Sequence, residues 1–253
     1  FRQIRKSLLQ QNKPASPAGR TAKYFKYAIG EIVLVVIGIL IALSINNWNE
    51  ERKSNLQEVK ILKHLKIDLV ANLQELNGYH GFGVLQKDAI DSVFVYFKEH
   101  RKSDNQLRIN FNYILSGTIF NNANTTYKNI ESSSKQIISN DTLRATVTQM
   151  YERGFKNIQI RASLINQIKF DQLMIYMNKH FKSHLISFEN SQKIIPLVEP
   201  IDIAKLQVDT EFENMLRRLY LHLEIGLGSE NETIDNLNKL ILNLQEEINR
   251  LEQ

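Results

Sequence analysis

YAIGEIVLVVIGILIALSINNW, residues 27–48, is the stretch of sequence that decides the fold. Eleven of the fourteen residues 32–45 are Ile, Leu or Val, and Glu31 is the single charged residue in 27–45. Nineteen helical residues rise about 28 Å, close to the roughly 30 Å of a bilayer's hydrocarbon core. The apolar residues favour membrane insertion by roughly 3–6 kcal/mol, whereas Glu31 lies about one turn from the end and can reach the interface. The stretch therefore predicts a transmembrane helix rather than a buried helix of a soluble protein.

Aromatic and basic residues around this helix predict its orientation. Tyr24 and Tyr27 stand at one end and Trp48 at the other, as in the aromatic belts of membrane interfaces. Residues 1–26 hold seven basic residues and no acidic one, whereas the five basic residues of 49–66 are mixed with three glutamates. The positive-inside rule therefore predicts a single-pass protein of the bacterial inner membrane, with a cytoplasmic N-terminus and a periplasmic main domain.

A cleaved signal peptide is the alternative interpretation of the same segment. A signal peptide would have a shorter apolar region than this one. The sequence Ser44-Ile45-Asn46 is also a poor cleavage site. We therefore expect the segment to be retained.

The basic residues of the tail are expected to meet the headgroups of the lipid bilayer. The formal net charge of the chain is +5, but the tail supplies +7 and Glu31 −1, so residues 46–253 sum to −1. A nucleic-acid-binding face is therefore not predicted. The chain has no cysteine, which excludes disulfides and cysteine metal sites. The residues expected at the headgroups are Arg2, Arg5, Lys6, Lys23 and Lys26.

We predict an all-α fold with three parts. A basic cytoplasmic tail (1–26) leads into the transmembrane helix (27–48), and an antiparallel helical bundle forms the periplasmic domain (49–253). The transmembrane helix has no breaker after Trp48 and is expected to continue as a stalk helix to about residue 77. GYHGFG, residues 78–83, predicts a turn.

Apolar spacing and capping residues predict the middle of the domain. Residues 84–101 predict a second helix that folds back. Residues 103–140 predict an irregular connection with short helical turns, in which an alternating stretch could also be a strand. Asp141 is a good N-cap for a helix that runs to about residue 181, and residues 195–201 predict an extended connection.

Two capping boxes predict the last two helices. Thr210-x-x-Glu213 opens the first, which Gly226 and Gly228 are expected to end. Ser229-x-x-Glu232 opens the C-terminal helix, whose apolar residues follow heptad spacing. Fewer than three heptads are marginal alone, so we expect this helix to pack on the stalk of the same chain or on a second protomer. The heptad residues are Ile234, Leu237, Ile241, Leu244, Ile248 and Leu251.

One stripe of the transmembrane helix has the features of a helix–helix interface. Gly38-x-x-x-Ala42 is a small-xxx-small motif that permits close backbone approach. The alternative is that Glu31 reaches headgroups or the lysines of the tail, and that Gly38 is incidental. The residues that share this stripe, from which we predict helix association, are Glu31, Val35, Gly38, Ala42 and Asn46.

Two motifs of the chain resemble a known family. YAIGEIVLVVIGILIALSINNWNEERK (27–53) and TYKNIESSSKQIISNDTLRATVTQMYE (126–152) are similar to an uncharacterised family of single-span membrane proteins common in Bacteroidota. The resemblance implies an inner-membrane anchor and a periplasmic helical domain. The family has no assigned activity, so the resemblance indicates none for this chain.

The sequence predicts no catalytic, cofactor or metal site. His180 and His184 have the i, i+4 spacing of two metal ligands on one helix face, but a third ligand is lacking. Nucleophile-elbow, P-loop and dinucleotide-binding motifs are absent. We therefore expect a non-enzymatic scaffold that acts by homo-oligomerisation or with another envelope membrane protein. The alternatives are a ligand-sensing module that signals through a partner, and a homo-oligomeric pore lined by the Glu31 stripe.

Overall fold

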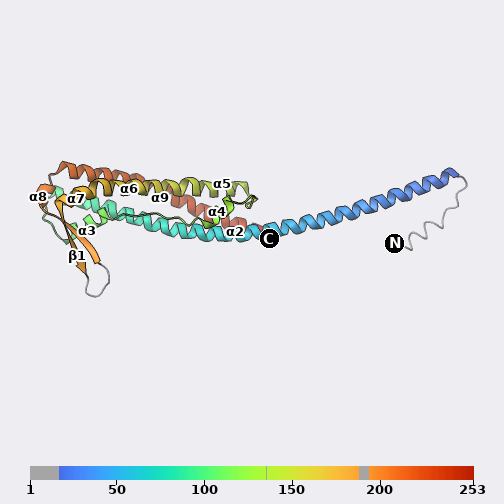
Figure 1. Cartoon of the computed structure of the whole chain (residues 1–253), viewed down its shortest axis with the longest axis horizontal. Coiled ribbons are helices and arrows are strands. Elements are labelled where there is room, and N and C mark those ends of the chain that lie inside the picture. The colour runs from blue at the N-terminus through green and yellow to red at the C-terminus, as the bar shows by residue number, and fades with distance from the viewer. Residues whose placement is uncertain (1–16, 135, 188–193) are drawn as a thin grey trace. The chain divides into compact units, whose positions relative to one another are not determined.

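The computed structural model describes residues 17–134, 136–187 and 194–253. It divides into two units, residues Phe1–Gln57 and Glu58–Gln253. The division falls inside the first helix, nine residues after the end of the predicted transmembrane segment at residue 48. The prediction of an all-α fold is confirmed, because helices dominate and the described residues add one two-stranded sheet (Figure 1).

Helix α2 runs without interruption from Pro17 to Lys98. The expected turn at 78–83, and the helix folding back after it, are therefore wrong. Each glycine disfavours a helix by about 1 kcal/mol relative to Ala, but packing overrides this cost here. Gly83 lies so close to helix α9 (Thr210–Leu251) that a Cβ atom on it would stand 3.1 Å from Leu227 Cδ2. The glycine thus permits helix contact rather than a turn.

The connection after α2 contains two short helices, α3 (Asn105–Leu115) and α4 (Thr125–Glu131). The alternative of a strand in this region is wrong. Leu107, Phe111 and Ile114 are buried at helical spacing on α3. Asp104 caps this helix by accepting a hydrogen bond from the backbone N–H of Leu107.

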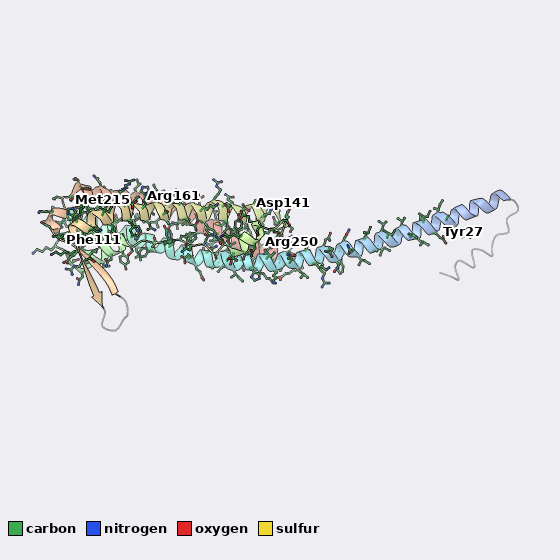
Figure 2. All side chains as sticks on the ribbon, viewed as in Figure 1. Tyr27, Phe111, Asp141, Arg161, Met215 and Arg250 are labelled. Atoms are coloured by element: carbon green, nitrogen blue, oxygen red, sulfur yellow. The ribbon has the colours of Figure 1, made fainter. Side chains whose placement is uncertain are left out.

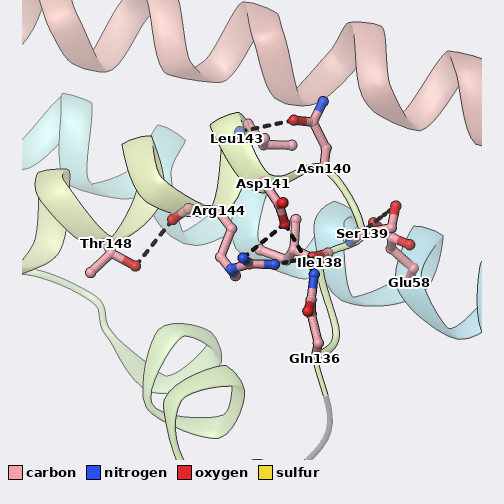
Figure 3. Close-up of polar contacts among 9 residues, drawn as sticks. All are labelled: Glu58, Gln136, Ile138, Ser139, Asn140, Asp141, Leu143, Arg144 and Thr148. Carbon is pink, nitrogen blue, oxygen red and sulfur yellow. Dashed lines mark hydrogen bonds and ion pairs between the residues drawn. The ribbon is translucent and has the colours of Figure 1, made fainter.

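The next helical run comprises α5 (Asp141–Gln149), the π-helical turn η1 (Met150–Phe155), α6 (Lys156–Ile168), the π-helical turn η2 (Lys169–Leu173) and α7 (Met174–His180). Its N-cap is Asn140 rather than Asp141. The Oδ1 atom of Asn140 accepts a hydrogen bond from Leu143 N at 3.0 Å (Figure 3). The predicted helix is thus present, with its cap displaced by one residue.

A β-hairpin follows, which the sequence did not predict as a sheet. Strands β1 (Phe181–Ser187) and β2 (Ile194–Pro200) pair antiparallel, with Phe181 opposite Pro200. The short helix α8 (Ile203–Leu206) leads to α9 (Thr210–Leu251).

Helix α9 is one helix where two were expected. Asp209, not Thr210, is its N-cap and accepts hydrogen bonds from Glu211 N and Phe212 N. The expected break at Gly226 and Gly228 is wrong. Gly226 is buried, and a Cβ atom there would stand 3.8 Å from Ile165 Cδ1 of α6. The helix nevertheless continues through Gly226, which lies beside α6, and through the exposed Gly228.

Apolar side chains of the second unit gather in two cores. The first core joins residues 59–76 of α2 to α5, η1 and the last third of α9. The second core joins residues 89–97 of α2 to α3, α7 and the first third of α9. Figure 2 places Asp141 at the end of the unit that holds the first core and Phe111 at the other end. Because the start of this part of α2 packs with the end of α9, the two helices are antiparallel.

Candidate functional site

Polar side chains of α2 hold the return segment, residues 116–140, against the bundle. Asn72 donates through Nδ2 to Ala123 O at 2.9 Å and accepts at Oδ1 from Ala123 N at 2.5 Å. Asp68 accepts a hydrogen bond from Thr126 N, in the first turn of α4, at 3.1 Å. This bond caps α4 in place of the side chain of its N-cap residue Asn124, which makes no capping hydrogen bond. The side chains of α2 therefore provide the hydrogen-bond partners that a neighbouring strand would otherwise give to the backbone of the return segment.

At the end of this segment, Glu58 makes a second anchor (Figure 3). One carboxylate oxygen of Glu58 accepts from Ser139 N at 2.8 Å and from Ser139 Oγ at 3.0 Å. Arg144 donates to Ile138 O at 3.1 Å and pairs with Asp141 at 2.8 Å. These bonds fix the chain where it enters α5.

The other side of the return segment is held by α6. Asn166 donates to Thr118 O at 2.8 Å and accepts from Thr118 N at 3.4 Å, so its amide matches both backbone groups of one residue. Gln159 donates to Asn122 Oδ1 at 2.9 Å. Asn72 and Asn166 thus hold an extended stretch of backbone in the groove between α2 and α6.

A fully buried lysine lies behind this segment. Lys169, which has no exposed surface, donates from Nζ to Ser116 O at 2.8 Å. Gln86 donates to the same carbonyl at 2.7 Å and to Tyr113 O at 2.8 Å. These are carbonyls at the C-terminal end of α3, where a helix leaves acceptors unpaired. Burial lowers the pKa of Lys169 to about 7.

Another polar contact, between α2 and α9, lies between the two cores. His80 Nδ1 lies 3.0 Å from Glu230 Oε2, and the Glu230 side chain is almost fully buried. Burial raises the pKa of Glu230, and the neighbouring His80 opposes that shift. Like Lys169, Glu230 has a structural partner, here the side chain of His80.

The second core borders a hollow of about 530 Å³ between α3, α7 and the hairpin. Leu115, Met174, Met177, Phe181 and Val198 supply its apolar lining. Asn112, Asn178 and Ser183 lie at the same hollow. Sequence reasoning missed this site because its walls come from segments far apart in the chain.

The predicted stripe of the apolar segment, residues 27–48, is exposed throughout. Val35 is 61% exposed, and Glu31, Gly38, Ala42 and Asn46 are also exposed. A Cβ atom on Gly38 would meet nothing within 4 Å, so the described residues leave room at this position. Of the predicted headgroup residues, Arg2, Arg5 and Lys6 lie outside the described residues. Lys23 and Lys26 belong to α2, without described side chains.

The heptad residues lie in the second half of α9 and face the first core. Leu237, Leu244 and Ile248 are buried there, and the other three are partly buried against it. Their packing partners in the structure come from α2, α5 and η1 of the same chain. The three partly buried residues are Ile234, Ile241 and Leu251.

The structure removes the geometric basis of the candidate histidine pair. Helix α7 ends at His180, and His184 lies on strand β1, so the two residues do not share a helix face. The ring of His180 stacks on Tyr176 with centroids 4.3 Å apart. Among the described residues, no group of three His, Cys, Asp or Glu side chains could hold a metal ion.

Comparison with protein families gives a match to a family model that covers residues 31–209, more than half of the chain. The chain belongs to DUF6090, a family of unknown function. The expectation of an uncharacterised family is thereby confirmed. The DUF6090 match begins at Glu31 and ends at Asp209, the N-cap of α9. Searches of curated proteins and of solved structures gave no match.

One helix among the described residues is long and apolar enough to cross a membrane. Its apolar window is wholly unburied and lies near the N-terminus. A membrane span has these properties, and so does a signal sequence.

Proposed function

We propose that this DUF6090 protein is a membrane-anchored, non-enzymatic scaffold, and that it acts by assembling with itself or with another envelope membrane protein. The single observation that carries the proposal is the exposed apolar surface of residues 27–48, where Ile32 is 62% and Val35 61% exposed. An exposed apolar surface of this length is stable against lipid or protein rather than water. The seven basic residues before it favour a cytoplasmic tail and a periplasmic domain in the inner membrane.

The expectation that the protein is not an enzyme is part of the same proposal. Several buried polar groups of the second unit bind backbone atoms or one another. Asn72, Asn166 and Lys169 hold the return segment, and Glu230 pairs with His80. These contacts support a structural role for the groups that could otherwise carry acid–base chemistry.

Assembly is proposed to use the Glu31 stripe. Gly38→Ile keeps the segment apolar, so insertion should persist, but the larger side chain should prevent close helix contact. Gly30→Ile is a matched control, because Gly30 lies about 100° away from Glu31 around the helix. The full chain in mild detergent should lose oligomer with Gly38→Ile and keep it with Gly30→Ile.

Glu31→Gln separates charge from shape in the same experiment. Loss of oligomer in this variant as well as in Gly38→Ile would support an interface held by both packing and the carboxylate. An oligomer size that is the same in all variants and wild type would mean that the stripe faces lipid. Assembly would then have to rest on the helical domain alone.

A ligand-sensing module is the second candidate, because the hollow beside α7 has the size and lining of a small-molecule site. Met174→Trp would fill the hollow from its half-buried wall. Any small molecule that raises the melting temperature of the wild type should fail to raise that of Met174→Trp. An equal shift in both proteins would exclude this hollow as the binding site.

A further inference from the structure

The three long helical elements of the second unit meet along three seams, and two of them are closed. The return segment covers the seam between α2 and α6, where Asn72 and Asn166 bind its backbone. Polar contacts bridge the seam between α2 and α9 from end to end. They join Lys63 to Glu252 at 2.6 Å, His80 to Glu230 at 3.0 Å and Lys87 to Glu224 at 3.4 Å.

The third seam, between the α5–η1–α6 run and α9, is hollowed instead. A groove of about 420 Å³ lies there. Among the residues that the structure describes, no hydrogen bond or ion pair joins its two walls. Its floor is formed by buried Met150, Thr233 and Leu240, together with Gly154. A Cβ atom on Gly154 would stand 3.0 Å from Met150 Sδ and 3.6 Å from Thr233 Cγ2. The absence of a side chain at this position therefore deepens the groove.

Side-chain amides line both walls of this groove. Gln149 and Asn157 lie on one wall, and Asn236 and Asn243 on the other. All four are exposed. Unlike Asn72 and Asn166, none of the four makes a hydrogen bond to another residue in the described part of the chain. A carboxamide both donates and accepts, so it matches the N–H and C=O of a peptide backbone.

The chain itself demonstrates this match, because Asn72 and Asn166 each bind both backbone groups of one residue in the return segment. We propose that the open groove binds an extended segment of another protein in the same manner. This proposal rests on the proposed assembly role and specifies its partner contact. Thr146 and Asn157 stand eleven residues apart along the helical run, a rise of about 16 Å, which about five residues of extended chain would span.

The occupant is another protein rather than a second copy of this chain. Within the described residues, the return segment is held by its own helices, and strands β1 and β2 pair with each other. The described part of a second copy therefore offers no free extended segment to the groove. Arg153 and Lys239 add positive charge to the groove against the single acid Glu232, which favours an acidic side chain on the partner segment.

A photoreactive phenylalanine in place of Asn236 tests the proposal in intact membranes, with Asn238 of the same helix as the control position. Asn238 is exposed and does not line the groove. We expect a crosslink at position 236, absent at 238, that maps to one contiguous segment of a different protein. No crosslink at 236, equal crosslinking at both positions, or a crosslink to a second copy would overturn the proposal.

A synthetic peptide with the crosslinked sequence then tests the mode of binding to the full chain. Asn157→Ala/Asn243→Ala should weaken its binding at least tenfold, whereas Asn231→Ala/Asn238→Ala should leave it unchanged. Methylation of the peptide's backbone nitrogens should abolish binding, because it removes the N–H groups that the side-chain amides of the groove are proposed to bind. Binding that survives both changes would contradict an extended occupant. If the groove fails these tests while Gly38→Ile still disrupts the oligomer, only the groove proposal falls.

Discussion

Two parts of helix α2 have the same backbone conformation and opposite surfaces. In the apolar segment, Ile32 and Val35 are 62% and 61% exposed, whereas Leu62 and Leu65, about eight turns further on, are fully buried. The first part is apolar on all sides, and the second is apolar only at every third or fourth residue. A helix satisfies its own backbone hydrogen bonds in either case, so the pattern of side chains decides which surroundings each part requires. Our account is that the first part requires lipid and the second requires the rest of its own domain.

The strongest test of this difference is to replace a leucine by alanine in each of the two parts. Leu65→Ala should reduce the free energy of unfolding by about 2–5 kcal/mol, because it leaves a cavity in the first core. Leu40→Ala should leave the unfolding of the domain unchanged, because Leu40 is 57% exposed and outside both cores. Thermal and denaturant unfolding of the full chain in detergent measures both. Equal losses would mean that the apolar segment packs against the domain.

Lys169 extends this comparison. The helical domain buries its amine, whereas the apolar segment exposes its alkyl side chains. The lysine titrates at about 7 when folded and at 10.5 when unfolded, so the unfolded state binds more protons between these values. Stability therefore rises with pH in that window, and the cost of burial is largest below pH 7. Between pH 7 and 9.5 the wild type should gain about 3 kcal/mol relative to Lys169→Met.

The difference between the two proteins is the relevant quantity, since other groups titrate equally in both. Denaturant unfolding at several pH values measures it. A difference that is flat with pH would show that Lys169 keeps an ordinary pKa, and hence that water reaches it.

A smaller effect is expected from the side chains that hold the return segment. Asn72→Ala leaves the N–H and C=O of Ala123 without their partners and should cost about 1–3 kcal/mol. It should also speed proteolysis within residues 116–124. Asn77→Ala is the control on the same helix, because Asn77 is exposed. Equal proteolysis of both variants would show that Asn72 does not hold the segment.

Much of the fold could be predicted from residues whose environment is local. The apolar segment, the helix after Asn140 and the heptad residues of α9 all follow from spacing along one helix. The glycines misled the prediction at Gly83 and Gly226, because close contact between helices outweighs their low helix propensity. Spacing alone does not report such contacts.

The candidate sites were less predictable, because they depend on contacts between distant segments. Lys169 did leave a signal, since it stands four residues after Ile165 and four before Leu173, on an otherwise apolar stripe. The amides Asn72 and Asn166 left none, because an isolated Asn on a helix more often faces water. Their partners, Ala123 and Thr118, lie about fifty residues away in sequence.

The orientation of the chain in the membrane tests the central claim most directly. Because the chain has no cysteine, Asn238→Cys in α9 and Ser7→Cys in the basic tail can each report alone. An impermeant thiol reagent is applied to cells whose outer membrane is permeabilised, before and after the inner membrane is opened. Our account predicts that Asn238→Cys reacts at once and that Ser7→Cys reacts only after the inner membrane is opened. Protection of Asn238→Cys until that point, or immediate reaction of Ser7→Cys, would contradict it.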